Sequence, residues 1–366
     1  MRKQKYKFDK VGKITVRSTY KPEDVTMLLK DITGQVEPLP TEVREKMIQR
    51  GKHYSEMLPL EYEPTEKYIR EYKSAISDYS EMTARAVCIV AEKIFRLKGK
   101  DVVIVSIARS GIPAGILIKR YLEKKYSVSV SHYTVSIIRG RGIDHNAMKH
   151  MLNIHKAENL QFVDGWTGKG AILKELKKGL SRYPGVSNEM AVIADPARIT
   201  NIWGTLDDFL IPSSCLNSTV SGLISRTFLR DDIIGKDDFH GAIYYKNFEK
   251  SDVSQEFIDS IEKYFDTETS IEDLVTSTNS GAIEEVQKIA DEFDVRDINF
   301  VKPGVGETTR VLLRRIPWKI LVNDINDTKH IGPILRLAKE KGVEVVEYPM
   351  AFYRSCGIIK ELAADV

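Results

Sequence analysis

The alternation of apolar runs with helical segments after residue 100 constrains the fold more than any other feature of the chain. Residues 101–111 (DVVIVSIARSG) form an almost continuous apolar run that ends in a glycine loop, and residues 112–125 have the spacing of a helix. Further apolar runs at 127–138, 159–165 and 191–195 continue the alternation. This pattern predicts an α/β fold with a parallel sheet flanked by helices on both faces. Ligands of such sheets bind at the carboxyl ends of the strands.

Three parts of the chain are predicted around this core. The length of 366 residues suits about two domains. Residues 1–100 are expected to form an N-terminal extension and hood, and residues 101–270 the sheet domain. Ser, Thr and Asp residues dominate 266–280, which is typical of a boundary. Residues 281–366 are expected to form a small C-terminal α/β domain.

Charge and cysteine content exclude several classes of protein. The 55 Lys and Arg residues nearly balance the 52 Asp and Glu residues, so net charge gives no argument for nucleic-acid binding. No apolar run approaches the ~20 residues that span a bilayer, and no apolar stretch follows the basic N-terminus, so we expect neither a membrane segment nor a signal peptide. The three scattered cysteines, Cys88, Cys215 and Cys356, favour a reducing compartment. We therefore expect a cytoplasmic protein.

Two loops that follow predicted strands carry the candidate chemistry. In the loop after Asp164, small residues stand where a helix begins, so backbone N–H groups can surround a phosphate. Asp164 itself can face a ribose diol or a water bound to Mg²⁺. The loop 108–111 (ARSG) is a second anion site, in which Arg109 suits a pyrophosphate. A nucleoside-triphosphatase P-loop is excluded because Gly170 follows Lys169 where Ser or Thr is required.

The residues of these loops resemble those of a known family. Residues 162–170 are similar to the phosphoribosyl-pyrophosphate motif of type I phosphoribosyltransferases, and residues 108–111 resemble their pyrophosphate loop. Nearly the full chain resembles phosphoribosyltransferase-like proteins with a C-terminal pelota-type RNA-binding domain, found with tellurite-resistance and stress-response genes. The matching segments are YKPEDVTMLLKDI, VDGWTGKGAI, IPSSCLNSTVSGLISRTFL and GVGETTRVLLRR. Some relatives are labelled cysteine proteases.

The resemblance implies an activity and the residues that would perform it. It implies a type I phosphoribosyltransferase-like fold and a Mg²⁺-dependent glycosyltransferase that displaces pyrophosphate from phosphoribosyl pyrophosphate, without direct metal ligands from the protein. The acceptor is unidentified, and the setting is nucleoside-like metabolite synthesis or an RNA-linked stress response. The catalytic candidates are Asp164, Arg109, Arg139 and Arg141. The binding candidates are Ala108, Ser110, Gly111, Gly165, Trp166, Thr167, Gly168, Lys169 and Gly170. The acceptor candidates are Asp195, His53 and Tyr54.

The C-terminal segment carries a second set of candidates. Residues 304–315 (GVGETTRVLLRR) resemble the RNA-facing loop and helix of the pelota and ribosomal L7Ae families. Arg310 and Arg314 are four residues apart on one helical face and can reach phosphates. The RNA-binding candidates are Gly304, Gly306, Glu307, Thr308, Arg310 and Arg314. The fold class also implies a homodimer.

Two alternative functions stay open from the sequence. Gly165 stands where ordinary phosphoribosyltransferases have a second acid, which favours a non-catalytic sensor of a ribosyl phosphate or nucleotide that is coupled to RNA binding. The other alternative is a cysteine hydrolase that uses Cys215. The Ser/Thr-rich segment around Cys215 is expected to open a helix, whose N-terminus would lower the thiol pKa.

Overall fold

The computed structural model describes residues 15–271 and 281–360. Its main body is a six-stranded sheet in the order β1-β4-β3-β7-β8-β9, in which every pairing is parallel. The strands are β1 (Thr26–Met27), β3 (Val103–Ile107), β4 (Ser131–Val135), β7 (Leu160–Trp166), β8 (Met190–Ala194) and β9 (Ile202–Thr205). The predicted α/β fold with a parallel sheet is confirmed.

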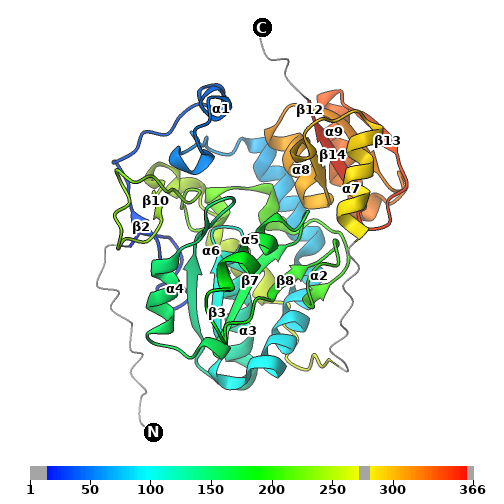
Figure 1. The fold of residues 1–366 in the computed structure, drawn as a ribbon. Coiled ribbons are helices and arrows are strands. Elements are labelled where there is room, and N and C mark those ends of the chain that lie inside the picture. The colour runs from blue at the N-terminus through cyan, green and yellow to red at the C-terminus, as the bar shows by residue number, and fades with distance from the viewer. Residues whose placement is uncertain (1–14, 272–280, 361–366) are drawn as a thin grey trace.

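Helices cover both faces of this sheet (Figure 1). One face packs on α2 (Glu66–Lys98), α3 (Gly111–Tyr126) and α6 (Ser254–Glu262). The other face packs on α4 (His145–Leu152) and α5 (Ala171–Leu180). Alternate residues of one strand enter the two cores: Ile104 faces the first, whereas Val103 and Val105 face the second. The sheet is therefore buried on both sides, as its nearly continuous apolar strands predict.

The N-terminal residues contribute to the sheet itself. Residues 26–27 form β1, the edge strand beside β4, and β2 (Lys30–Asp31) pairs with β10 (Gly241–Ala242). The remainder of this part includes α1 (Thr41–Gln49) and then α2, which packs along the sheet. Strands from both ranges, 1–100 and 101–270, thus form one sheet. The division of the chain between these two ranges stays a prediction.

Between β4 and α4 the chain forms a two-stranded antiparallel hairpin. It consists of β5 (Ile137–Ile138) and β6 (Gly142–Ile143), joined by the turn that carries Arg139. Gly140 and Gly142 both have positive φ values, which a tight turn of this kind requires. The hairpin packs beside α5.

The C-terminal domain is a small mixed sheet with helices, as predicted. Its order is β11-β14-β12-β13, with only the β12–β13 pairing parallel. The strands are β11 (Val301–Pro303), β12 (Pro317–Val322), β13 (Glu344–Glu347) and β14 (Ser355–Ile359), and the helices are α7 (Gly281–Glu292), α8 (Val305–Arg314) and α9 (Thr328–Lys341). Residues 272–280, which make up most of the predicted boundary segment 266–280, lie outside the described residues.

The C-terminal domain lies against the first domain rather than apart from it. In Figure 1 its helices, coloured yellow to orange, lie beside α2. Tyr79 of α2 donates a hydrogen bond of 2.6 Å to the carbonyl oxygen of Lys329 in α9, and Tyr68 donates one to that of Leu313 in α8. Within the described residues, no helix combines the length and apolar character needed to cross a bilayer.

Candidate functional site

The two predicted anion loops meet at the carboxyl edge of the sheet, around Asp164. Its Oδ1 accepts hydrogen bonds from Ser110 Oγ at 2.9 Å and from the Gly165 amide at 2.7 Å. Gly111 permits this contact, because a Cβ there would stand 2.7 Å from the carbonyl oxygen of Val163. Asp164 is only 7% exposed, and burial raises its pKa to about 6 against the opposing effect of those hydrogen bonds. The sequence therefore predicted this juxtaposition correctly.

Both carboxyl oxygens of Asp195, an acceptor candidate, accept hydrogen bonds from neighbouring residues. Its Oδ1 accepts a hydrogen bond of 2.5 Å from Thr167 Oγ1, and its Oδ2 accepts one of 2.9 Å from the Thr200 amide. The residue is fully buried, and burial raises its pKa above the usual range. Oδ1 thus fixes the loop after β7 to the loop after β8, and Oδ2 braces the latter loop internally.

Arg109 points toward a residue that the sequence analysis missed. Its guanidinium forms a 2.7 Å ion pair with Glu61 and donates to the carbonyl oxygen of Ile224 at 2.9 Å. Burial alone would raise the pKa of Glu61, but the Arg109 charge and the hydrogen bonds at this carboxylate hold the pKa below its usual value. No periodicity or motif surrounds Glu61, so only the three-dimensional fold identifies it.

The acceptor candidates His53 and Tyr54 lie beside the hairpin turn that carries Arg139 and Arg141. The amide of Arg139 donates to Tyr54 Oη at 2.8 Å, and His53 Nε2 donates to the carbonyl oxygen of Arg139 at 3.2 Å. The guanidinium of Arg139 reaches Asn299 Oδ1 in the C-terminal domain at 3.1 Å, whereas Arg141 pairs with Glu56. Both arginines therefore hold the turn to its neighbours in this structure.

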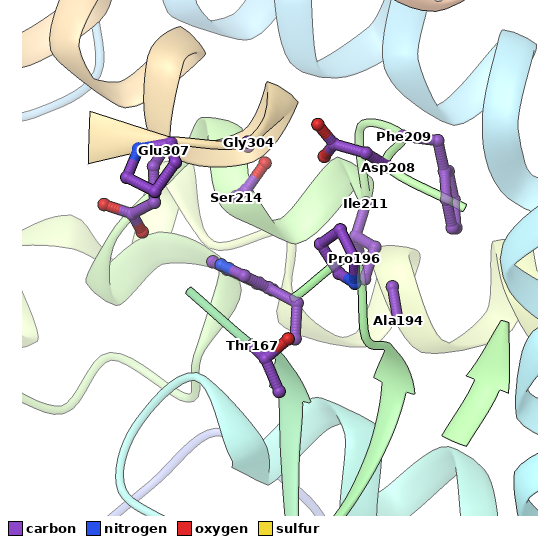
Figure 2. Close-up of a pocket in the computed structure, with 12 residues that line it drawn as sticks. Thr167, Ala194, Pro196, Asp208, Phe209, Ile211, Ser214, Gly304 and Glu307 are labelled. Atoms are coloured by element: carbon purple, nitrogen blue, oxygen red, sulfur yellow. The ribbon is translucent and has the colours of Figure 1, made fainter. Parts of the chain in front are cut away.

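A pocket lies between the carboxyl edge of the main sheet and the start of α8 (Figure 2). Thr167 and Ser214 line it from the first domain, and Gly304 and Glu307 line it from the C-terminal domain. The Trp166 ring also lines this pocket, and the Arg310 guanidinium lies 6.0 Å from its centroid. The pocket is thus a feature of the interface between the two domains.

Asp208 joins the two domains beside this pocket. Its Oδ1 accepts from the Val305 amide at 2.9 Å and its Oδ2 from the Arg354 amide at 2.8 Å. Burial raises the pKa of Asp208 to about 6, against the opposing effect of both hydrogen bonds. On the same interface, Lys169 Nζ donates to the carbonyl oxygens of Ile298 and Val301. The Gly-rich loop 165–170 is therefore attached to the C-terminal domain through its lysine.

The residues assigned to RNA binding lie at this interface as well. Gly304, Gly306 and Thr308 are buried, and Glu307 and Arg310 are half-buried. Arg314, also half-buried, donates to Asn217 Oδ1 and, at 3.4 Å, to the carbonyl oxygen of Ser214. These side chains face the first domain in this arrangement, and their role toward RNA stays a prediction.

Cys215 has a different environment from the one that the sequence predicts. It ends a short 3₁₀-helix (Pro212–Cys215), and no α-helix begins there, so the expected helix N-terminus is absent from this described segment and that prediction is wrong. The side chain is fully buried, and burial raises the thiol pKa to about 12, with the Arg314 charge opposing that rise. Among the described residues, no hydrogen bond joins Cys215 to a histidine. Cys88 and Cys356 are buried free thiols too.

Comparison with known proteins gives two family matches. Residues 18–262 match the family of the tellurite-like stress resistance cysteine protease StiP, and residues 280–361 match the PELOTA RNA binding domain. A relative from Acinetobacter baylyi, named "Cysteine protease StiP", is 34% identical over 364 residues, which cover 94% of this chain and 94% of the relative. No solved structure matches the chain.

These matches confirm one part of the sequence analysis and correct another. The resemblance to the tellurite- and stress-associated proteins with a pelota domain is confirmed. The predicted glycosyltransferase activity is wrong, because the family and the relative point to a cysteine protease. The chemistry of the site offers a physical reason, since Gly165 supplies no second carboxylate beside Asp164 and Lys169 binds the C-terminal domain.

Proposed function

Because the chain belongs to the family of tellurite-like stress resistance cysteine proteases, we propose that it is a cysteine hydrolase whose nucleophile is Cys215. The family match, which carries the proposal, spans Cys88 and Cys215 but not Cys356. Cys215 follows Ser214, a residue that lines the pocket between the domains. Cys88 lies within the long helix α2, and both thiols belong to the same apolar core. Position thus favours Cys215 over Cys88.

The surroundings of Cys215 suggest how its thiol would be activated. A thiolate attacks the carbonyl carbon of a peptide bond, the C–N bond breaks, and the amine leaves with a proton; water then hydrolyses the thioester. The guanidinium of Arg314 is the cation whose charge favours that thiolate. Contacts of α8 with residues 212–215 cover the thiol in this structure. Movement of α8 away from this segment would expose the thiol and lower its pKa by rehydration.

A peptidase assay with matched variants tests the proposal. The full chain is incubated with unfolded casein, and new amino termini are measured for wild type, Cys215→Ala and Cys88→Ala. The latter is the control, because it also removes a buried, free thiol. We expect wild type and Cys88→Ala to cleave casein and Cys215→Ala to be inactive. Activity that persists in Cys215→Ala, or its absence from wild type, would overturn the assignment.

RNA binding by the C-terminal domain is a second proposed activity, supported by the PELOTA match. Arg310 and Arg314 contact or face the first domain here, so the movement that exposes Cys215 would also free them. Retention of a labelled single-stranded RNA by wild type, and its loss in Arg310→Ala, would support this activity; equal retention by both would contradict it. Phosphoribosyl pyrophosphate, Mg²⁺, the homodimer and a cytoplasmic location find no support in the comparisons and stay predictions.

A further inference from the structure

The helix α8 of the C-terminal domain covers the segment of the first domain that carries Cys215. At the end of the helix, Arg314 donates to Asn217 Oδ1 and to the carbonyl oxygen of Ser214. In its first turn, a Cβ on Gly306 would stand 3.5 Å from Ser214 Oγ (Figure 2). The side chain of Cys215 is fully buried. A peptide substrate therefore cannot reach the thiol in this arrangement.

Hydrogen bonds from the first domain hold the C-terminal domain in this closed position. Lys169 Nζ donates to the carbonyl oxygen of Val301 at 3.1 Å, and Asp208 Oδ1 accepts from the Val305 amide at 2.9 Å. Closure also has a cost, because Ser214 Oγ is buried and has no hydrogen-bond partner among the described residues. Water would bind this hydroxyl once α8 moved away, so its hydration favours opening.

Exposed side chains beyond the end of α8 suit a single-stranded nucleic acid. Arg315 is exposed, and Ile316 and Trp318 are 53% and 43% exposed. The ammonium group of Lys319, which also pairs with Glu344, lies 5.7 Å from the centroid of the Trp318 ring. Unstacked bases stack on aromatic rings, and neighbouring cations bind the phosphates. We call Arg315, Ile316, Trp318 and Lys319 the entry surface.

The arginines of α8 continue from the entry surface but face the first domain. Arg314 precedes Arg315 and is bonded to residues 214 and 217. Arg310 lies one turn earlier on the same helical face, with its guanidinium 6.0 Å from the centroid of the Trp166 ring. A strand that extends from the entry surface along this face meets the first domain. RNA and the first domain therefore compete for one face of α8.

We propose that the C-terminal domain is an autoinhibitory cover of the Cys215 site, and that single-stranded RNA opens the cover and so activates the hydrolase. This inference rests on the proposed function, whose site it regulates. A ligand shifts an equilibrium only by its difference in affinity for the two states. RNA on the entry surface alone binds both states equally, whereas RNA that reaches Arg310 and Arg314 binds the open state. Without RNA, the minor open population supports a basal rate of cleavage.

Alkylation of Cys215 by iodoacetamide measures opening without requiring catalysis. The full chain is treated with the reagent alone, with a long oligouridylate and with a uridine dinucleotide, and modified cysteines are identified by peptide mass spectrometry. We expect the long RNA to raise the rate at Cys215 about tenfold, which requires at least a tenfold preference for the open state. The dinucleotide, too short to span the face, should leave the rate unchanged, and Cys88 within α2 should stay unmodified throughout. Long RNA that is retained by the chain without faster alkylation of Cys215 would overturn the proposal.

A pair of lysine variants tests the cover without RNA. Lys169→Met removes a donor to the C-terminal domain, and Lys98→Met is the matched control, because Lys98 donates to the carbonyl oxygen of Glu158 within the first domain. We expect Lys169→Met to raise alkylation of Cys215 about tenfold, as loss of a charge-assisted hydrogen bond predicts. Since coupling is reciprocal, the same variant should bind the long RNA more tightly, by up to that factor. Equal alkylation in the two variants would contradict the proposal.

The casein assay separates failure of this inference from failure of the proposed function. If the same RNA concentrations stimulate alkylation of Cys215 and cleavage of casein, both are supported. If RNA speeds alkylation while casein stays intact, the cover is supported and the hydrolase assignment is wrong. If casein is cleaved equally with and without retained RNA, the hydrolase assignment stands and the RNA-dependent cover is wrong.

Discussion

The carboxyl group of Asp208 makes the contact between the two domains sensitive to pH. Burial raises its pKa from 3.8 to about 6. In the unfolded chain the group loses its proton at the lower value, so between about pH 4 and pH 6 the folded state binds more protons. The stability contributed by this group is therefore complete below about pH 4 and is lost as the pH rises through about 6. The shift corresponds to about 3 kcal/mol in the free energy of unfolding.

Replacement of Asp208 by Asn removes this titration. The amide oxygen still accepts one backbone N–H, but its NH₂ group cannot accept the other, which costs about 1–3 kcal/mol. At neutral pH this loss is offset by the absence of a buried charge, whereas near pH 4 the variant is less stable than wild type. Asp164, with the same raised pKa, continues to titrate in the variant. We therefore expect Asp208→Asn to flatten the decline of stability with pH by about 3 kcal/mol.

Urea unfolding at several pH values between about 4 and 7 measures this difference. Tryptophan fluorescence is a suitable signal, because Trp166 lies at the interface that Asp208 holds together. Asp207→Asn is the control: it removes a charge from the adjacent position, where the side chain is 40% exposed and pairs with Arg354. Its pH profile should stay close to that of wild type, because burial, and only to a small extent the Asp207 charge, raises the pKa of Asp208. An Asp208→Asn profile as steep as the wild-type one would refute the reasoning.

Two further predictions concern the candidate site. Gly111→Ala should destabilise the chain by about 1–3 kcal/mol, because the added carbon would stand 2.7 Å from a backbone carbonyl oxygen. Gly168→Ala, with nothing within 4 Å of the added carbon, should leave the melting temperature nearly unchanged, and an equal loss in both would contradict this account. Glu61→Gln should cost about 3–5 kcal/mol, because it leaves a buried guanidinium without its partner. Asp232→Asn, which breaks an exposed pair, should hardly shift the urea midpoint; a comparable shift in both would be the opposing result.

The sequence predicts best those features that local patterns encode. The strands at 103–107 and 160–166 lie in predominantly apolar segments that the sequence predicts as strands. Because the carboxyl ends of neighbouring parallel strands share an edge of the sheet, the meeting of Ser110 with Asp164 follows from that prediction. Glu61 and Asp208 belong to segments without periodicity, and each acquires its partner only when distant parts of the chain pack together.

Cys215 shows why local sequence can also mislead. The Ser/Thr-rich residues around it suit a helix start, but they form 3₁₀ turns in this fold. Its thiol pKa is governed by burial beneath α8, a helix that lies about 90 positions later in the chain. No spacing within the segment around Cys215 contains information about that docking.

The edge strand β1 also has a consequence for synthesis of the protein. Residues 26–27 pair with residues 133–134, so they leave the ribosome roughly a hundred residues before their partner strand. Throughout that interval the apolar side chains of Val25 and Met27 have no sheet to cover them. We therefore expect nascent chains at this stage to bind chaperones. For the same reason, a fragment that begins after residue 100 lacks β1, so its β4 edge would be open to self-association.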